Sequence, residues 1–170
     1  MTISAPLNVL FLCTHNSARS ILAEALLNAM AGDRFKAYSA GSSPRANQQP
    51  HPLGLQVLQA AGFSTEGLRS KNWDEFAAPG APHMDLIITV CDNAAGEVCP
   101  VWPGHPATAH WGFPDPSEGD ASEAHKLEAF RQTLHTMKRR LELLINLPVS
   151  KLGRSVLQGT ARELASLPVA

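Results

Sequence analysis

The residues with the clearest chemical potential lie in one short stretch, CTHNSARS, from Cys13 to Ser20. Cysteine is a nucleophile when it is a thiolate, and arginine offers a planar pair of donors to two oxygens of an oxyanion. The spacing from Cys13 to Arg19 is long enough to wrap one loop around such an anion. Asn16 could hold that loop in a strained shape, and Ser20 could donate a hydrogen bond to the sulfur. The stretch therefore indicates an anion site above a sulfur nucleophile.

The predicted elements around this stretch support that interpretation. Residues 7–12 (LNVLFL) form a short, nearly continuous apolar run, which is typical of a strand buried on both faces in a parallel sheet. From Ser17 onward, apolar residues recur at helical spacing as far as Met30, and Gly32 could end that helix in a left-handed cap. Ligands of such sheets bind beyond the carboxyl ends of the strands, where a helix start attracts anions and favours a thiolate. The alternative is a buried strand-end Cys13 with an exposed Arg19.

The rest of the chain continues the alternation of strands and helices. Strands are predicted over 35–40, 84–90 and 107–111, and helices after Pro52, where Gly62 stops the helix, and after Asp120. Asp120 and Glu123 resemble a capping box in front of a long helix with an apolar stripe. A last amphipathic helix is expected after Pro148. This order predicts an α/β domain.

Composition limits the kinds of protein this chain can be. Its 170 residues are 44% hydrophobic, which fits one compact domain spanning residues 1–170. The formal net charge is −1, with 14 basic and 15 acidic residues mixed along the chain, so we expect no general affinity for nucleic acid or for anionic membranes. The N-terminal residues resemble neither a signal peptide nor an anchor. Three cysteines without an export signal indicate a reducing, cytoplasmic location.

Two cysteines lie outside the loop and admit several interpretations. Cys91 ends the strand predicted over 84–90, and Cys99 follows in a segment rich in glycine and proline. Each could be an incidental core or loop thiol, or the pair could exchange disulfides with Cys13. A metal site formed with His105 and His110 is a further alternative, although the spacing departs from the short pairs of structural zinc sites.

Four motifs together resemble the low-molecular-weight tyrosine phosphatase fold and the arsenate reductases that share it: VLFLCTHNSARS, YSAG, DLIITVCDNAAGEVCPVWPG and AHWGFPDP. The resemblance implies an α/β three-layer sandwich with a four-stranded parallel sheet and helices on both sides. It also implies a phosphate-binding loop of the form C-x5-R-S/T with Asn at the third position after Cys. In this chain that loop would bind substrate through Thr14, His15, Asn16, Ser17, Ala18, Arg19 and Ser20.

The resemblance implies two possible activities. In an arsenate reductase Cys13 would attack arsenate, Asp115 would protonate the leaving oxygen, and Cys91 and then Cys99 would carry the disulfide to thioredoxin, or to glutaredoxin with glutathione. In a phosphatase the same loop would hydrolyse a phosphomonoester through a phosphocysteine, with Asp115 as the acid. The phosphatases carry a Tyr after the Asp-Pro pair, whereas Ser117 follows Pro116 here. The arsenate reductase is therefore favoured, and a non-catalytic oxyanion or redox sensor is a third alternative.

The resemblance further suggests a cation beside the loop. Several thioredoxin-coupled reductases bind potassium through oxygen ligands, and Asn16, Glu24, Ser39 and Asp74 resemble those positions. Each also has an ordinary interpretation as a capping, helix-face or loop residue. No other cofactor is expected to be required.

Overall fold

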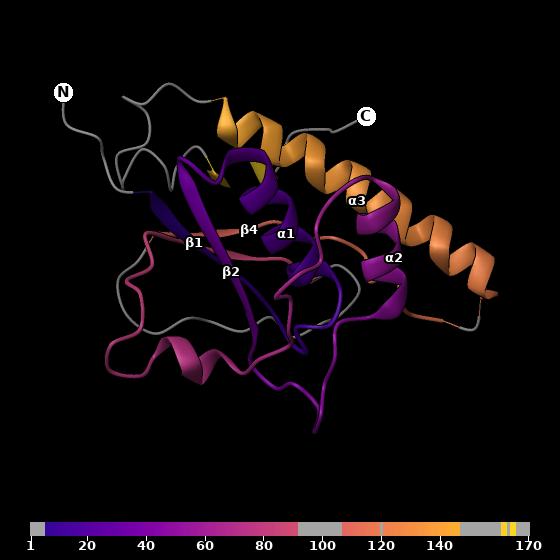
Figure 1. Cartoon of the computed structure of the whole chain (residues 1–170), viewed down its shortest axis with the longest axis horizontal. Coiled ribbons are helices and arrows are strands. Elements are labelled where there is room, and N and C mark those ends of the chain that lie inside the picture. The colour runs from indigo at the N-terminus through magenta and orange to yellow at the C-terminus, as the bar shows by residue number, and fades with distance from the viewer. Residues whose placement is uncertain (1–5, 92–106, 120, 147–160, 163, 166–170) are drawn as a thin grey trace.

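A four-stranded parallel sheet lies at the centre of the protein (Figure 1). The computed structural model describes residues 6–91, 107–119, 121–146, 161–162 and 164–165. The strands are arranged in the order β2-β1-β3-β4, and their bounds are β1 (Leu7–Cys13), β2 (Phe35–Gly41), β3 (Leu86–Thr89) and β4 (Ala107–His110). The predicted α/β class and the four-stranded parallel sheet are thus confirmed.

Strand β1 occupies the interior of the sheet. It pairs with β2 from Leu7↔Phe35 to Cys13↔Gly41 and with β3 from Val9↔Leu86 to Leu12↔Thr89. Because β1 has a strand on each side and packing on both faces, residues 9–12 have no exposed surface, which explains their continuous apolar run. Cys13 therefore lies at the carboxyl end of the central strands, between the ends of β2 and β3.

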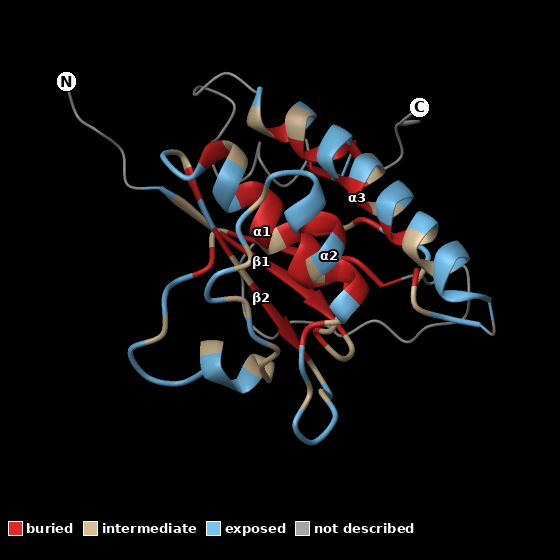
Figure 2. Ribbon diagram, turned by 45° about the vertical axis from the view of Figure 1, so that its right-hand side comes forward, coloured by how far each residue is buried: buried red, intermediate tan, exposed pale blue. Residues whose placement is uncertain are grey.

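The two faces of the sheet are covered differently (Figure 2). Three α-helices, α1 (Arg19–Ala31), α2 (Pro52–Ala60) and α3 (Glu123–Ile145), pack on one face and enclose the larger core. On the other face a smaller cluster around Leu10, Leu12 and Ile87 packs against the 3-10 helix η1 (Trp73–Phe76). Helix α3 keeps a buried stripe toward the core and an exposed outer side. The sheet thus lies between two layers, which agrees with the expected three-layer arrangement.

Two predicted helix ends differ from the structure. Gly32 has φ −63 and is right-handed, so the predicted left-handed cap is wrong; a Cβ there would lie 2.6 Å from the carbonyl oxygen of Asn28, so the glycine serves close backbone approach instead. The N-cap of α3 is Ser122, whose Oγ accepts from the backbone N–H of His125, and not Asp120, which lies outside the described residues. Gly62 has φ +87 beyond the end of α2, as predicted.

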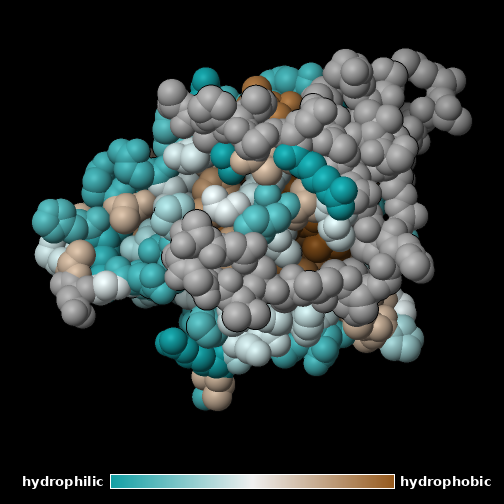
Figure 3. All heavy atoms as spheres, turned by 180° about the vertical axis from the view of Figure 1, so that it is seen from behind, coloured by the Kyte–Doolittle hydropathy of each residue, from teal (hydrophilic) through white to brown (hydrophobic). Residues whose placement is uncertain are grey.

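The described surface carries few large apolar side chains. Seen from behind, described residues are mainly hydrophilic to neutral, with small areas of apolar atoms (Figure 3). Among the helices of the described residues, none has the length and apolar character needed to cross a bilayer.

The end of β2 packs tightly on the loop that follows β1. A Cβ added to Gly41 would lie 2.6 Å from the carbonyl oxygen of Thr14, 2.8 Å from the carbonyl carbon of His15 and 2.9 Å from the backbone nitrogen of Asn16. The Ser43 N–H also donates to the Thr14 carbonyl at 2.8 Å. The loop after β1 can therefore take this position only because residue 41 has no side chain.

We predict that Gly41→Ala lowers the free energy of unfolding by about 1–3 kcal/mol, because backbone atoms must move to admit the methyl group. The matched control is Gly54→Ala in α2, where the added Cβ would lie 3.4 Å from a ring carbon of Phe130. That control should be neutral or more stable by up to about 1 kcal/mol. Urea denaturation followed by circular dichroism measures both, and a Gly41→Ala protein as stable as wild type would contradict this packing argument.

Candidate active site

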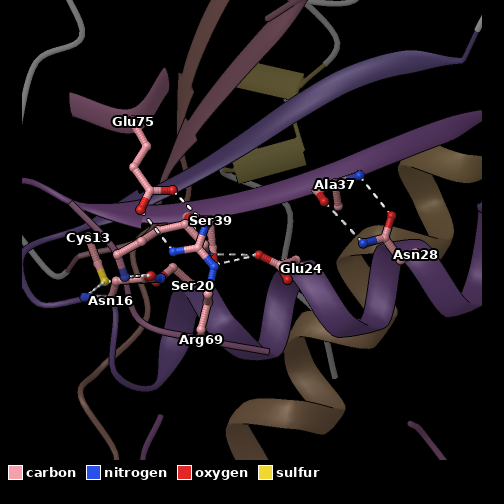
Figure 4. Close-up of polar contacts among 10 residues, drawn as sticks. Cys13, Asn16, Ser20, Glu24, Asn28, Ala37, Ser39, Arg69 and Glu75 are labelled. Atoms are coloured by element: carbon pink, nitrogen blue, oxygen red, sulfur yellow. Dashed lines mark hydrogen bonds and ion pairs between the residues drawn. The ribbon is translucent and has the colours of Figure 1, made fainter. Parts of the chain in front are cut away.

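The loop between β1 and α1 directs hydrogen-bond donors at the Cys13 sulfur (Figure 4). The backbone N–H of Asn16 donates to Cys13 Sγ at 3.2 Å, and Ser20 Oγ lies 2.9 Å from the same sulfur. Asn16 Nδ2 donates to Ser20 Oγ at 2.8 Å, which leaves the Ser20 proton available for the sulfur. Cys13 is a free cysteine. The Cys13 sulfur therefore has two hydrogen-bond donors close to it at the start of α1.

Asn16 gives the loop its shape. It is fully buried and has φ +56, in the left-handed region that asparagine tolerates better than most residues. Its Oδ1 accepts a hydrogen bond from the backbone N–H of Lys71 at 2.9 Å. The backbone N–H and both side-chain polar atoms of Asn16 thus form hydrogen bonds. Lys71, which is distant in the sequence, holds the turn that brings the Asn16 N–H to the sulfur.

Arg19 connects the loop to the segment after β4. Its Nη1 donates to the carbonyl oxygen of Phe113 at 2.9 Å, and its Nη2 lies 3.7 Å from Asp115 Oδ2. The Arg19 side chain is 6% exposed and that of Asp115 is 21% exposed. Ser117 donates to Asp115 Oδ1 from its N–H at 2.9 Å and from its Oγ at 2.6 Å. The structure therefore brings the predicted acid and the predicted anion-binding arginine together at one edge of the sheet.

These residues border a cavity of about 830 Å³. Part of its wall comes from the loop itself, and another part from residues 45–52, which the sequence analysis did not assign to the site. No Phe, Tyr or Trp side chain belongs to the part of the wall that the structure describes. The lining residues are Cys13, Thr14, His15, Ser17, Ala18, Arg19, Arg45, Ala46, Asn47, Gln48, Gln49, Pro50, His51, Pro52, Asp115, Ser117 and Glu118.

The predicted substrate-binding residues therefore separate into two groups. Five of the seven line the cavity, whereas Asn16 and Ser20 lie behind the loop, fully buried, and contact the sulfur. Tyr38, the only tyrosine, packs edge-on against Phe76, with ring centroids 5.4 Å apart, and does not border the cavity.

The second cysteine follows the neighbouring strand. Cys91 comes just after β3, where the Val90 N–H donates to the Leu12 carbonyl at 2.9 Å. Cys91 is fully buried and is held in a disulfide. Cys99 and His105 lie outside the described residues. His110 Nδ1 lies 2.7 Å from Thr89 Oγ1, and the described residues include no group of three or more His, Cys, Asp or Glu side chains suited to a metal ion.

Two of the four expected potassium ligands, Glu24 and Ser39, contact the side chain of Lys71. Glu24 and Ser39 lie together, but the Lys71 ammonium contacts both, at 3.5 Å from Glu24 Oε1 and 2.7 Å from the Ser39 carbonyl oxygen. Asp74 is exposed on η1, and its backbone N–H donates to Asn72 Oδ1 at 2.8 Å. Glu24 and Ser39 do not fit a potassium ion, because the Lys71 ammonium already uses their oxygens, and Asn16 Oδ1 accepts from the Lys71 backbone N–H. Sequence reasoning missed Lys71, since a single lysine in a polar stretch carries no signal.

Comparison with known proteins agrees with this geometry. An arsenate reductase of Bacillus licheniformis is 32% identical over 135 residues, which is 79% of this chain and 91% of that protein. The crystal structure of an arsenate reductase from Archaeoglobus fulgidus superposes with a TM-score of 0.66 at 31% identity, covering 82% of this chain and 99% of that one.

A thioredoxin-dependent arsenate reductase of Corynebacterium glutamicum superposes with a TM-score of 0.54 at 29% identity, covering 84% of this chain and 65% of that one. Residues 8–156 also match the family model described as low molecular weight phosphotyrosine protein phosphatase. The match extends over most of the chain, including the loop from Cys13 to Ser20 and Asp115. The chain therefore belongs to the low molecular weight phosphotyrosine protein phosphatase family.

Proposed function

We propose that this protein is an arsenate reductase that acts in the cytoplasm and uses Cys13 as its nucleophile. The observation that carries the proposal is the buried Cys13 sulfur, which has hydrogen-bond donors around it and borders a cavity that also receives Arg19. Arsenate is a tetrahedral oxyanion, and the loop amides and a guanidinium are the groups that bind such anions. The relatives described above that are named arsenate reductases support this substrate.

In the first step the Cys13 thiolate attacks arsenic in line with a leaving oxygen. A sulfur–arsenic bond forms, an arsenic–oxygen bond breaks, and Asp115 gives a proton to the departing oxygen, which leaves as water. Ser117 holds one carboxyl oxygen of Asp115 with two hydrogen bonds. The other oxygen, Oδ2, lies on the side of Arg19, where the arginine would hold the arsenate oxygens. Asp115 is thereby oriented for proton transfer.

In the second step two electrons pass from sulfur to arsenic. The Cys91 thiolate attacks Cys13 Sγ and forms a disulfide, while the electron pair of the sulfur–arsenic bond stays with arsenic, which leaves as arsenite. Cys99 then attacks Cys91, which frees the Cys13 thiolate. A disulfide at Cys91 together with a free Cys13 is the state that this sequence of steps predicts before the external dithiol acts. Thioredoxin, or glutaredoxin with glutathione, would supply the dithiol that restores the reduced state.

The phosphatase alternative shares the first step, but it needs side chains that bind the organic part of a phosphomonoester. A phosphotyrosine ring buries best against aromatic or apolar side chains, and the described cavity wall has no Phe, Tyr or Trp. Arg45, Asn47, Gln48 and Gln49 give this wall a polar character, which suits a small hydrated anion.

We expect Cys13→Ser and Cys91→Ser each to abolish arsenate turnover, because one removes the nucleophile and the other removes the electron donor for arsenite release. The measurement is arsenate-dependent oxidation of NADPH coupled through thioredoxin and its reductase. With thioredoxin as the reductant, Cys99→Ser should turn over arsenate much more slowly than wild type. Recovery of its turnover with glutathione and glutaredoxin would identify these as the alternative reductant.

Hydrolysis of an aryl phosphate serves as the control for these variants. Cys13→Ser should lose any such hydrolysis, whereas Cys91→Ser should keep it, because hydrolysis needs only the loop and the acid. Robust arsenate turnover by Cys91→Ser would contradict the sulfur relay, and efficient aryl phosphate hydrolysis without arsenate reduction in the wild type would favour the phosphatase.

We expect Asp115→Asn to lower kcat for arsenate by about 10²- to 10⁴-fold, which is the usual contribution of a positioned general acid. The amide keeps the shape of the side chain and can still accept from Ser117, so KM should change much less than kcat. Asp33→Asn, in the exposed turn after α1, is the matched control and should match wild type. A kcat for Asp115→Asn within about threefold of wild type would show that another group protonates the leaving oxygen.

A further inference from the structure

The Lys71 ammonium is enclosed by oxygen atoms beneath the candidate active site. Its Nζ donates to the Ser39 carbonyl at 2.7 Å and lies 3.4 Å from Ser39 Oγ and 3.5 Å from Glu24 Oε1. The Lys71 side chain is 8% exposed and that of Glu24 is 14% exposed. Ser39 Oγ in turn donates to Glu24 Oε1 at 2.7 Å (Figure 4). The ammonium therefore binds several oxygens from α1 and β2 at once, as a small cation would.

The backbone of the same residue is bound to the loop and to β2. The Lys71 N–H donates to Asn16 Oδ1 at 2.9 Å, and its carbonyl accepts from the Gly41 N–H at 2.9 Å. Lys71 is thus fixed at both its side chain and its backbone. Because Asn16 presents its own N–H to Cys13 Sγ at 3.2 Å, a continuous set of contacts runs from the buried ammonium to the sulfur.

Electrostatics explains why a cation is needed here. A buried carboxylate without a partner is costly, and the Glu24 carboxylate faces the Lys71 ammonium and the Ser39 hydroxyl. Burial lowers the pKa of Lys71, while the nearby Glu24 opposes that shift. Arg69 and Glu75 form an exposed ion pair, 2.6 Å between Nη2 and Oε2, at the outer side of this cluster. Loss of the Lys71 charge would leave the Glu24 carboxylate without the ammonium that contacts it behind the loop.

We propose that Lys71 is a positioning residue that supplies the cation beneath the phosphate-binding loop, so that Asn16 and Cys13 are held in place without a bound potassium ion. The proposal deepens the arsenate reductase assignment and rests on it for its effect on turnover. Its structural part concerns only the loop and the sulfur. It can therefore be tested separately, with readouts that need no arsenate.

The test compares wild type, Lys71→Met and Lys71→Ala, with Lys36→Met as the matched control, since Lys36 is an exposed lysine on β2. The first readout is the rate at which iodoacetamide alkylates Cys13 in the reduced protein between pH 5 and 9, followed by mass spectrometry of the Cys13 peptide. The second is the thermal midpoint Tm. Both are measured in potassium chloride and in choline chloride at equal ionic strength, because choline is too large for the Glu24–Ser39 site.

We expect wild type and Lys36→Met to give the same alkylation rate and Tm in both salts. Lys71→Met should alkylate about 10-fold more slowly at neutral pH and lose kcat for arsenate by about 10- to 100-fold, because the loop no longer holds its donors at the sulfur. Lys71→Ala, which leaves space between Glu24 and Ser39, should recover alkylation rate and Tm in potassium chloride but not in choline chloride.

Three results would overturn the proposal. A wild-type Tm or alkylation rate that rises with potassium but not choline would show that a metal ion binds beside the lysine. Wild-type alkylation by Lys71→Met would show that the ammonium does not position the sulfur, and an equal response of Lys71→Ala to both salts would show that no cation belongs in this place. If wild type failed to reduce arsenate but the alkylation results held, the assignment of activity would fail while the role of Lys71 stood.

Discussion

Hydrogen bonding at a single buried asparagine is the interaction on which the candidate active site depends. A sulfur at the end of a fully enclosed strand has little contact with water, so its charged form needs donors from the protein. Asn16 provides a backbone N–H to Cys13 and a side-chain N–H to Ser20, while its side-chain oxygen Oδ1 accepts from the Lys71 N–H. Its left-handed backbone aims these groups in different directions. Hydrogen bonds to Lys71 and Ser20, on the side of the loop away from the cavity, therefore hold the loop in the shape that points its donors at the sulfur.

The rest of the fold supplies the surfaces against which this loop is built. The pairing of Cys13 with Gly41 brings β2 so close that only glycine fits beneath the loop. The parallel pairing of β1 with β3 brings Val90 beside Leu12, so that Cys91 follows at the same edge of the sheet. Arg19 is anchored on the carbonyl of Phe113, which sets Asp115 at the mouth of the cavity. Segments far apart in the sequence thus meet at one place because parallel strands all end there.

Local patterns predicted most of the elements, whereas contacts between distant residues escaped prediction. The apolar run at 7–12, the spacing from Cys13 to Arg19 and the proline at the start of α2 each have a local physical cause, and β1, the loop and α2 follow from them. Lys71 binds Ser39 and Asn16, which lie 32 and 55 residues away in the sequence. No local sequence pattern predicts contacts between residues so far apart. The same holds for the cavity wall at 45–51, which lacks regular structure. The prediction of a left-handed cap at Gly32 was wrong because a glycine can be required by a close backbone contact as well as by a positive φ.

The central step of the proposed reaction is the transfer of two electrons from the Cys13 and Cys91 sulfurs to arsenic, after an arsenic–sulfur bond has formed at Cys13. A single-turnover reaction of reduced Cys99→Ser protein with arsenate, in the absence of any other thiol, tests it most directly. Peptide mapping should find a disulfide between Cys13 and Cys91, with about one arsenite released per protein chain, since a two-electron reduction consumes one dithiol. Arsenite release without that disulfide, or a protein that keeps both cysteines reduced after exposure to arsenate, would contradict the account.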